Sequence, residues 1–342
     1  MEPDWADVKE VYGEALERDS QARTAYLDEA CSGQPRLRAE VDRLLRENDD
    51  DDGPLSEPSI WKPAEVFAPG EVIQDRFVVV RLIGRGGIGE VYEVQDRLME
   101  RRLAMKTLQS SVLSKADARG RFKREILMGQ KVSHRNCCRI YDAILTKTGW
   151  GEAVSFTMEL LEGETLAQRL SRDGHLREGE AWALALPMAQ GLAAVHEAGL
   201  VHRDFKPANV VLSRDDSGQQ RVVVTDFGLT RPGSKEQAEV FWRSQTGQIL
   251  GTESYMAPEQ REGRDLTPAA DVYALGLVLV EMLQGAGPAK AGHVRPTALR
   301  GHWTELINRC LQRDPAERPQ SAAEVAATLR GFVRMPPPKR DS

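Results

Sequence analysis

The spacing of apolar side chains changes twice along the chain and separates regions of different structure. In the first region, apolar residues recur at helical spacing through Val8 and Tyr12, and again through Leu37 and Val41. This pattern predicts short amphipathic helices, which we expect to form a small helical region over residues 1–48.

The helical pattern ends at a run of four aspartates, Asp49 to Asp52, followed by Gly53 and Pro54. Such a composition is well solvated and packs poorly, so it predicts a linker, which we place at residues 49–70. Residues 1–52 contain 16 Asp and Glu against 7 Lys and Arg, so the acidity of the chain belongs to this first part.

From Arg76 onward the pattern changes to short runs rich in Val and Ile, which favour strands. After about Glu164 it changes again to longer helical stretches, and the chain ends in a Pro-rich basic tail over residues 333–342. Strands followed by helices predict an α+β architecture of two unlike lobes.

Composition narrows the classes of protein that are possible. The chain has 342 residues, of which 41% are hydrophobic and 29% charged, values typical of globular proteins. The net charge of −6 argues against a nucleic-acid partner. The longest apolar run, Val272 to Leu283, is too short for a membrane span, and the acidic N-terminus lacks a secretory signal, so we expect a cytoplasmic location.

The first motif with chemical meaning is the glycine-rich stretch Gly84-Arg85-Gly86-Gly87-Ile88-Gly89, between two strand-like segments. Glycines at this spacing let the backbone approach phosphate oxygens because no Cβ stands in the way. A dinucleotide-binding turn has the same spacing but is followed directly by a helix. The strand-like sequence after Gly89 therefore disfavours a dinucleotide-dependent oxidoreductase.

A second group of motifs has the residues that phosphoryl transfer needs. Lys106 ends an apolar strand, and the helical run that follows contains Glu125. Further along are His202-Arg203-Asp204-Phe205-Lys206-Pro207-Ala208-Asn209, then Asp226-Phe227-Gly228, then Ala257-Pro258-Glu259. Transfer requires a carboxylate to accept a hydroxyl proton, and an amide and a carboxylate to hold Mg²⁺.

These five motifs, in this order, resemble the eukaryotic-like Ser/Thr protein kinase family of bacterial type, over roughly residues 76–332. The resemblance implies a bilobal protein kinase fold with a β-rich N-lobe and a helical C-lobe, which we place at residues 71–332. It also implies ATP, Mg²⁺ or Mn²⁺, and protein substrates as partners.

The resemblance assigns roles to individual residues. Lys106 would contact the α- and β-phosphates and pair with Glu125, and Asp204 would orient the acceptor hydroxyl. Lys206, typical of Ser/Thr kinases, would neutralise the γ-phosphate. The ion would be held by Asn209 and Asp226. The adenine pocket implied by the resemblance consists of Val91, Ala104, Met158, Glu159, Leu161 and Val211.

Other matches to the family are structural. Glu259 and Arg318 resemble a buried ion pair that anchors the C-lobe, and Asp271 resembles an aspartate that braces the catalytic loop. His134 and His196 are lone histidines, which we interpret as packed or hydrogen-bonded structural residues.

Two features concern regulation. Arg203 precedes Asp204, and kinases with this pair commonly use the arginine to bind the phosphate of a phosphorylated activation loop. Ser244 and Thr246 are the candidate phosphorylation sites in that loop. Gly129 stands four residues after Glu125, where the family places an apolar side chain. A glycine inside a helix predicts a loosely held helix.

Two alternatives to a protein kinase remain. A pseudokinase would bind nucleotide without transfer, but such proteins usually lose the lysine or one of the aspartates. A small-molecule phosphotransferase is expected to lack Lys206 in this context and the Ala257-Pro258-Glu259 segment. The N-terminal helices would dock a protein partner, inhibit the kinase domain or serve only as solubilising packing.

Overall fold

The computed structural model describes residues 11–12, 14–15, 20–49, 66–86, 89–108, 126–148, 151–215, 217–227, 253–285 and 301–332. Its contacts divide the chain into two compact units, Met1–Glu65 and Val66–Ser342. The family motifs all lie in the second unit.

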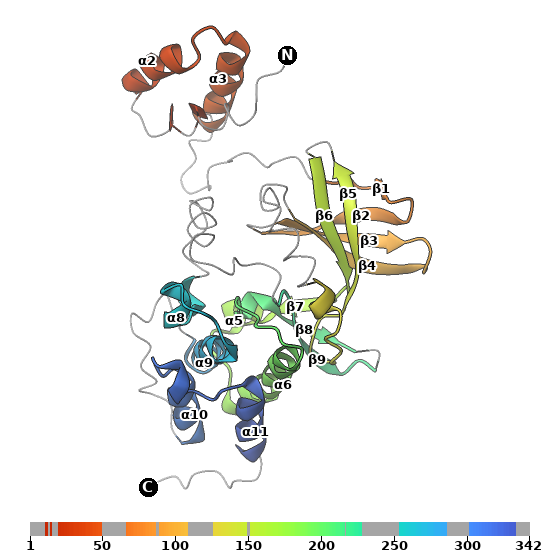
Figure 1. The fold of residues 1–342 in the computed structure, drawn as a ribbon, viewed down its shortest axis with the longest axis vertical. Coiled ribbons are helices and arrows are strands. Elements are labelled where there is room, and N and C mark those ends of the chain that lie inside the picture. The colour runs from red at the N-terminus through yellow and green to blue at the C-terminus, as the bar shows by residue number, and fades with distance from the viewer. Residues whose placement is uncertain are drawn as a thin grey trace. The chain divides into compact units, whose positions relative to one another are not determined.

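The first unit contains helices α2 (Ser20–Ala30) and α3 (Pro35–Asp49), shown in red in Figure 1. In α3, the apolar residues Leu37, Val41 and Leu45 are four apart and lie on one face of the helix, as the helical spacing predicted. They complete a small apolar core of Val11, Ala15, Leu27, Cys31, Leu37, Val41 and Leu45. Arg38 pairs with Asp42 at 2.9 Å and with Asp28 at 2.5 Å, which ties α3 to α2.

The second unit begins with a sheet of six antiparallel strands in the order β1-β2-β3-β4-β6-β5. The strands are β1 (Val72–Ile73), β2 (Phe77–Gly86), β3 (Gly89–Asp96), β4 (Arg101–Leu108), β5 (Ile140–Thr148) and β6 (Gly151–Met158). Figure 1 shows this curled sheet as the strand-rich lobe.

Side chains alternate between the two faces of this sheet, and the two faces hold different kinds of side chain. One face is an apolar core that includes Phe77, Tyr92 and Met105. Val91 pairs with Lys106 in the ladder, and Ala104 pairs with Met158. Directly paired residues share a face, so these four side chains lie on the face opposite to the apolar core.

The predicted linker over residues 49–70 differs from the structure at its C-terminal end. Val66 donates a backbone hydrogen bond to Glu90 Oε2 at 2.9 Å, and Phe67 donates one to the Tyr92 hydroxyl at 3.1 Å. Phe67 is 1% exposed and its ring meets that of Tyr92 edge to face. Because an aromatic side chain gains so much by burial, residues 66–70 pack with the sheet.

The helical lobe follows the sheet. It contains a small sheet of β7 (Gly163–Thr165), β8 (Val210–Arg214) and β9 (Gln220–Val224), in that order. Its helices are α5 (Leu166–Asp173), α6 (Glu178–Glu197), α8 (Pro258–Arg261), α9 (Pro268–Gln284), α10 (His302–Cys310) and α11 (Ala322–Phe332). Short 3₁₀ turns cover Pro207–Asn209, Glu253–Tyr255 and Pro315–Glu317.

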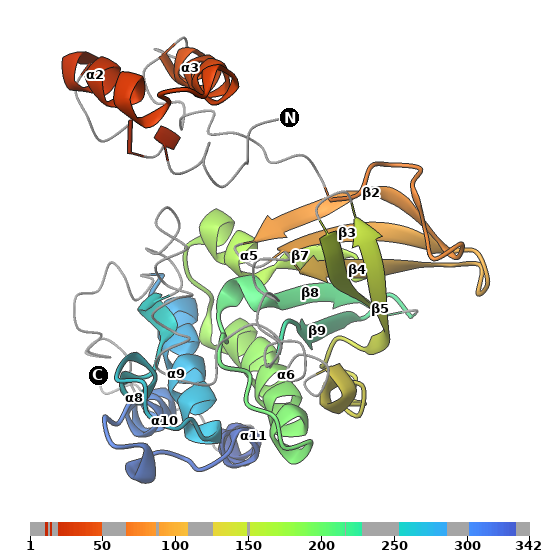
Figure 2. The same ribbon diagram turned by 45° about the horizontal axis from the view of Figure 1, so that its top comes forward.

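Helices α6 and α9 form the centre of this lobe, because they are apolar on most sides. Their buried residues make one core with α10, α11, β8 and β9. Figure 2 shows β8 and β9 between the curled sheet and α6. The structure therefore confirms the predicted α+β fold with a β-rich and a helical lobe. Within the described ranges, no helix is long and apolar enough to cross a membrane.

Candidate active site

The loop from His202 to Asn209 is held by Asp271, a buried carboxylate in the first turn of α9. Asp271 accepts backbone hydrogen bonds from His202 at 2.7 Å and Arg203 at 2.9 Å. Arg203 has a positive φ of 66°, a conformation that needs such support. Burial would raise the pKa of Asp271, but its hydrogen bonds with the His196 side chain and the His202 backbone hold that pKa below its usual value.

His196 in α6 fixes this aspartate from the other side. Its Nε2 donates to Asp271 Oδ2 at 2.9 Å, since its Nδ1 accepts a hydrogen bond from the Ala322 backbone at 3.4 Å. His196 is thus a hydrogen-bonded structural residue, but one that supports the catalytic loop. No local sequence signal indicates this, because its partners lie 75 and 126 residues away.

Asp204 and Lys206 meet within the loop, with Lys206 Nζ 3.0 Å from Asp204 Oδ2. The Asn209 side chain donates to the Asp204 carbonyl at 2.7 Å and, more weakly, to Asp204 Oδ2 at 3.3 Å. These bonds use the amide nitrogen of Asn209 and leave its side-chain oxygen as an acceptor. The loop therefore presents a carboxylate, an ammonium group and an amide oxygen together.

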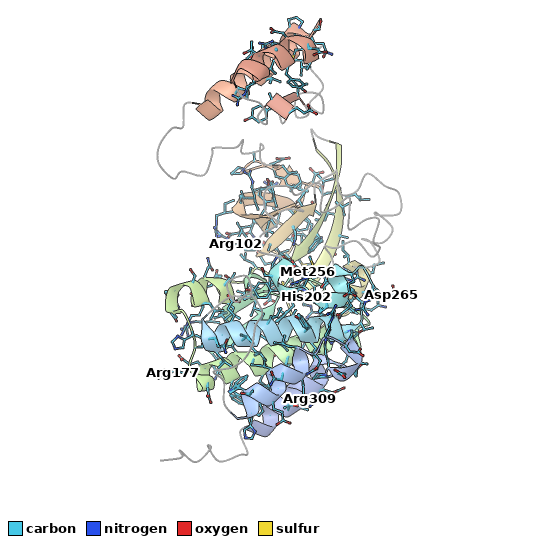
Figure 3. All side chains as sticks on the ribbon, turned by 90° about the vertical axis from the view of Figure 1, so that its left-hand side faces the viewer. Arg102, Arg177, His202, Met256, Asp265 and Arg309 are labelled. Carbon is cyan, nitrogen blue, oxygen red and sulfur yellow. The ribbon has the colours of Figure 1, made fainter. Side chains whose placement is uncertain are left out.

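His202 joins this loop to the segment that contains Asp226. Its Nδ1 accepts from the Asp204 backbone at 3.3 Å, and its Nε2 donates to the Thr225 carbonyl at 2.9 Å. Burial lowers the pKa of His202, so a neutral ring makes both bonds. The Thr225 backbone also donates to the Asn209 carbonyl at 2.9 Å. In Figure 3, His202 and Met256 are labelled where the strands give way to helices.

Asp226 follows directly and faces Lys106 from β4. Lys106 Nζ lies 2.8 Å from Asp226 Oδ1, and the lysine is buried. Burial opposes ionisation of Asp226, but the attraction and hydrogen bond of Lys106 lower its pKa below the usual range. Asp226 has a positive φ of 59°, the second left-handed non-glycine residue of this site. The predicted partner of Lys106, Glu125, lies outside the described residues.

The predicted nucleotide pocket draws on both sheets. Val91, Ala104 and Met158 lie on the Lys106 face of the large sheet, and Val211 lies in β8 opposite Thr165. Residues 159–162, which include Glu159 and Leu161, link β6 to β7 without regular structure.

The glycine-rich stretch forms the end of a hairpin, since Gly84 pairs with Val91 and Gly86 with Gly89. Gly87 and Ile88 lie outside the described residues. Arg85 Nε donates to Glu90 Oε1 at 2.8 Å, across the hairpin. The Glu90 carboxylate also accepts the backbone hydrogen bond of Val66, so it holds both the hairpin and residues 66–67.

At Gly129, where the sequence predicted a loosely held helix, the side chain of another residue packs against the glycine. A Cβ at Gly129 would stand 2.8 Å from Ile140 Cδ1 and 3.7 Å from a ring carbon of Phe227. Gly129 is buried, and Ile140 and Phe227 belong to one apolar cluster. The side chain of Ile140 therefore takes the room that a larger residue at position 129 would need.

Arg318 and Glu259 form a bidentate ion pair in the interior of the helical lobe, at 2.7 and 2.9 Å. The remaining N–H groups of Arg318 donate to the carbonyls of Ala269, Gln312 and Arg313. All five guanidinium donors are satisfied, as burial of this charge requires. The candidate phosphorylation sites Ser244 and Thr246 lie outside the described residues.

A strand-rich lobe and a helical lobe, with Lys106 from one facing Asp226 from the other, define the two-lobed phosphotransferase architecture. Residues 77–329 match the protein kinase domain, and the chain belongs to this family. The predicted family is thereby confirmed.

Bacterial Ser/Thr kinases are among the curated relatives. Serine/threonine-protein kinase pkn2 of Myxococcus xanthus is 34% identical over 284 residues, which cover 77% of this chain and 33% of that protein. Serine/threonine-protein kinase PknA of Mycobacterium tuberculosis is 34% identical over 289 residues, covering 79% of this chain and 65% of that protein. The chain thus spans less than two thirds of either relative.

Among solved structures, the PknI kinase domain of Mycobacterium tuberculosis shares the fold. It superposes with a TM-score of 0.62 at 28% sequence identity, covering 78% of this chain and 99% of that chain. The protein kinase family implies the use of ATP and a divalent metal ion.

Proposed function

We propose that this protein transfers the γ-phosphate of ATP to serine or threonine hydroxyls of protein substrates. The observation that supports this best is the convergence of Asp204, Lys206 and Asn209 in one braced loop, with Asp226 held beside it through Thr225. A pseudokinase would not need this complete set. The names of the bacterial relatives support the same reaction.

In this proposal, Asp204 accepts the proton of the acceptor hydroxyl while the hydroxyl oxygen attacks the γ-phosphorus, and the bond from that phosphorus to the oxygen bridging to the β-phosphate breaks to release ADP. Lys206, already 3.0 Å from Asp204, stabilises the negative charge that develops on the transferred group. Lys106 binds the phosphates of the nucleotide, and the apolar pocket around Ala104 and Met158 receives the adenine.

Asn209 and Asp226 are suited to hold Mg²⁺, with Mn²⁺ as the alternative. Their donors are an amide oxygen and a carboxylate oxygen, the hard ligands that these ions prefer. The lowered pKa of Asp226 keeps its carboxylate ionised for this task. When bound, the ion would supply charge neutralisation at the phosphates.

The assay that tests this function uses γ-labelled ATP, Mg²⁺ and a generic basic protein, with the Asp204→Asn variant as control. We expect label on serine and threonine, and a loss of about 10²- to 10⁴-fold in the variant, the range for a missing general base. Nucleotide binding without any transfer by the wild-type protein would indicate a pseudokinase instead.

The same labelled protein tests regulation. We propose that Ser244 and Thr246 are autophosphorylated and that Arg203 then pairs with the phosphate. Mass spectrometry of fully active protein that finds both hydroxyls unmodified would reject this.

We further propose a protein partner for the N-terminal helices, which a pull-down with residues 1–65 present or deleted would test.

A further inference from the structure

Arg221 lies in β9, the strand that ends two residues before Asp226, and its guanidinium joins two other segments of the chain. Nη2 donates to Glu159 Oε2 at 3.1 Å, and Nη1 makes a closer contact with Glu159 Oε1. Nε donates to the Arg135 carbonyl at 2.5 Å. One side chain thus connects β9, the segment before β5 and the connection between the two lobes.

The ion pair with Glu159 is well formed and largely shielded. The Arg221 side chain is 18% exposed, far less than Arg81 and Arg102 in the strand-rich lobe, and that of Glu159 is 23% exposed. The hydrogen bond to Glu159 raises the pKa of Arg221, so the guanidinium stays charged. A bidentate fork fixes orientation as well as distance, which an ammonium group does not do.

The backbone around Arg221 explains why β9 can serve as an anchor. Val224 donates to the Asn136 carbonyl at 2.9 Å, and Cys138 donates to the Val224 carbonyl at 2.9 Å. The Asn136 side chain donates to the Val222 carbonyl at 2.7 Å. Residues 136–138 therefore lie along β9 as a short parallel partner, in register with the strand that leads to Asp226.

Glu159, in contrast, lies outside regular secondary structure. It is the first residue after β6, and residues 159–162 pass to β7 without regular structure. Its backbone donates to the Arg139 carbonyl at 2.9 Å, and its own carbonyl accepts from Cys138 Sγ at 3.7 Å. Its carboxylate accepts from the Arg139 backbone at 3.5 Å and, more closely, from the Arg221 fork. The contacts to residues 138 and 139 hold this connection to the end of the segment before β5, and the ion pair with Arg221 is its direct link to β9.

We propose that Arg221 is a positioning residue for nucleotide binding, which fixes the lobe connection at Glu159 against the strand that leads to Asp226. The proposal rests on the proposed function and on the adenine pocket implied by the family resemblance, which includes Glu159 and Leu161. Arg221 itself does not touch the nucleotide. It holds the adenine-binding backbone and the metal-binding aspartate in one frame, so that the two ends of ATP are recognised together.

The expected signature is a change in nucleotide affinity. If loss of the fork leaves only about a tenth of the molecules with the productive connection, the dissociation constant for nucleotide rises about tenfold. The turnover number should change little, because Asp204 and Lys206 are held by Asp271 and not by Arg221.

The experiment uses the full chain and compares Arg221→Ala and Arg221→Lys with the wild-type protein. It measures the Kd for ADP by calorimetry, and KM for ATP and kcat in the labelling assay. We expect Arg221→Ala to raise Kd and KM about tenfold with kcat within about twofold, and Arg221→Lys to fall between, since it keeps the charge without the fork.

Arg214→Ala is the matched control. Arg214 lies in the neighbouring strand β8, is exposed and donates to the Gly218 carbonyl at 2.8 Å, so its loss should leave Kd and KM unchanged. Combining Arg221→Ala with Glu159→Gln should add little to the larger single effect, because both changes remove the same interaction.

The outcomes separate the two proposals. Arg221→Ala with wild-type Kd and KM, or with a reduced kcat alone, would overturn the positioning role while the kinase activity stands. If Arg221→Ala does not fold, unchanged Kd and KM in a folded Arg221→Lys variant would overturn it as well. A wild-type protein that binds ADP but transfers no phosphate would remove the proposed function and leave the affinity test of Arg221 in force.

Discussion

The helical lobe and the strand-rich lobe hold their charged side chains in different ways. In the helical lobe, Arg318 is fully buried against Glu259, which is 4% exposed. In the strand-rich lobe, Glu93 is as deeply buried, but its partners Arg81 and Arg102 are 64% and 60% exposed. The first arrangement removes both charges from water, whereas the second leaves the cations solvated.

This difference suggests how the two lobes share their tasks. A desolvated network is costly to break, so Arg318 fixes Glu259 firmly against the start of α9 at Ala269 and against residues 312–313. Solvated pairs contribute little and exchange easily, so the sheet above the nucleotide is held chiefly by its apolar face. Substitution of Arg318 should therefore cost more than substitution of Arg81 or Arg102.

The largest effect is expected for Arg318→Met. It leaves the Glu259 carboxylate buried without its partner, so the free energy of unfolding should fall by about 3–5 kcal/mol. Urea denaturation measures this difference. In the double variant with Glu259→Gln no charge is left buried, and part of the loss should be recovered. A single-variant loss below about 1 kcal/mol would show that the pair is not desolvated.

A smaller effect, with a distinct pH dependence, is expected for Asp271→Asn. An amide cannot accept from the His202 and Arg203 backbones and from His196 at once, so about 1–3 kcal/mol should be lost near pH 7. The folded-state pKa of Asp271 lies below its unfolded value of about 3.9. Its stabilisation is thus complete above that value and disappears as the pH falls through the folded-state pKa.

Urea denaturation of both proteins between pH 7 and pH 3 measures this gap. The gap should begin to narrow below about pH 4, where the unfolded carboxylate takes up its proton, and narrow further as the pH falls towards the lower folded-state pKa. A gap that stays constant over this range would mean that the carboxylate charge has no part in holding the loop. The labelling assay should show a reduced kcat in the variant at pH 7, because Arg203 and Asp204 would lose their support.

How much of this network the sequence could reveal depended on the distance between partners. Asp204, Lys206 and Asn209 stand within one short motif, so their meeting could be anticipated from the order of residues. The sheet and the helices followed from apolar periodicity, which depends only on near neighbours.

The roles of the supporting residues could not be predicted from the sequence, because each depends on a contact with a residue far along the chain. His196 reaches Asp271 and Ala322, and Arg221 reaches Glu159 across 62 residues. An arginine in a strand is otherwise typical of a solvated face. Phe67 was assigned to a linker because the aspartates before it dominate the local composition, while its partner Tyr92 stands 25 residues away.

The third prediction concerns Gly129 and Ile140, where the lobes meet in apolar packing. Ile140→Val removes Cδ1 and should cost about 0.5–1.5 kcal/mol in the free energy of unfolding. In that background Gly129→Ala should be more favourable than in the wild-type protein by about 1 kcal/mol, since the added methyl group no longer meets Ile140 Cδ1.

A double-mutant cycle from urea denaturation measures this coupling. Equal effects of Gly129→Ala in both backgrounds would show that the Ile140 side chain rotates away freely. That result would also mean that Phe227 does not depend on Ile140 for its position, although both lie in one cluster.

The smallest single effects are expected at Arg81 and Arg102. Either Arg81→Gln or Arg102→Gln should change the free energy of unfolding by less than about 1 kcal/mol, because each cation is largely solvated and Glu93 keeps the other partner. The double variant should lose more than the sum of the two, since the buried carboxylate of Glu93 then has neither cation. Additive single effects would show that the Glu93 carboxylate does not need a cationic partner. The two sites would then differ only in the exposure of their arginines.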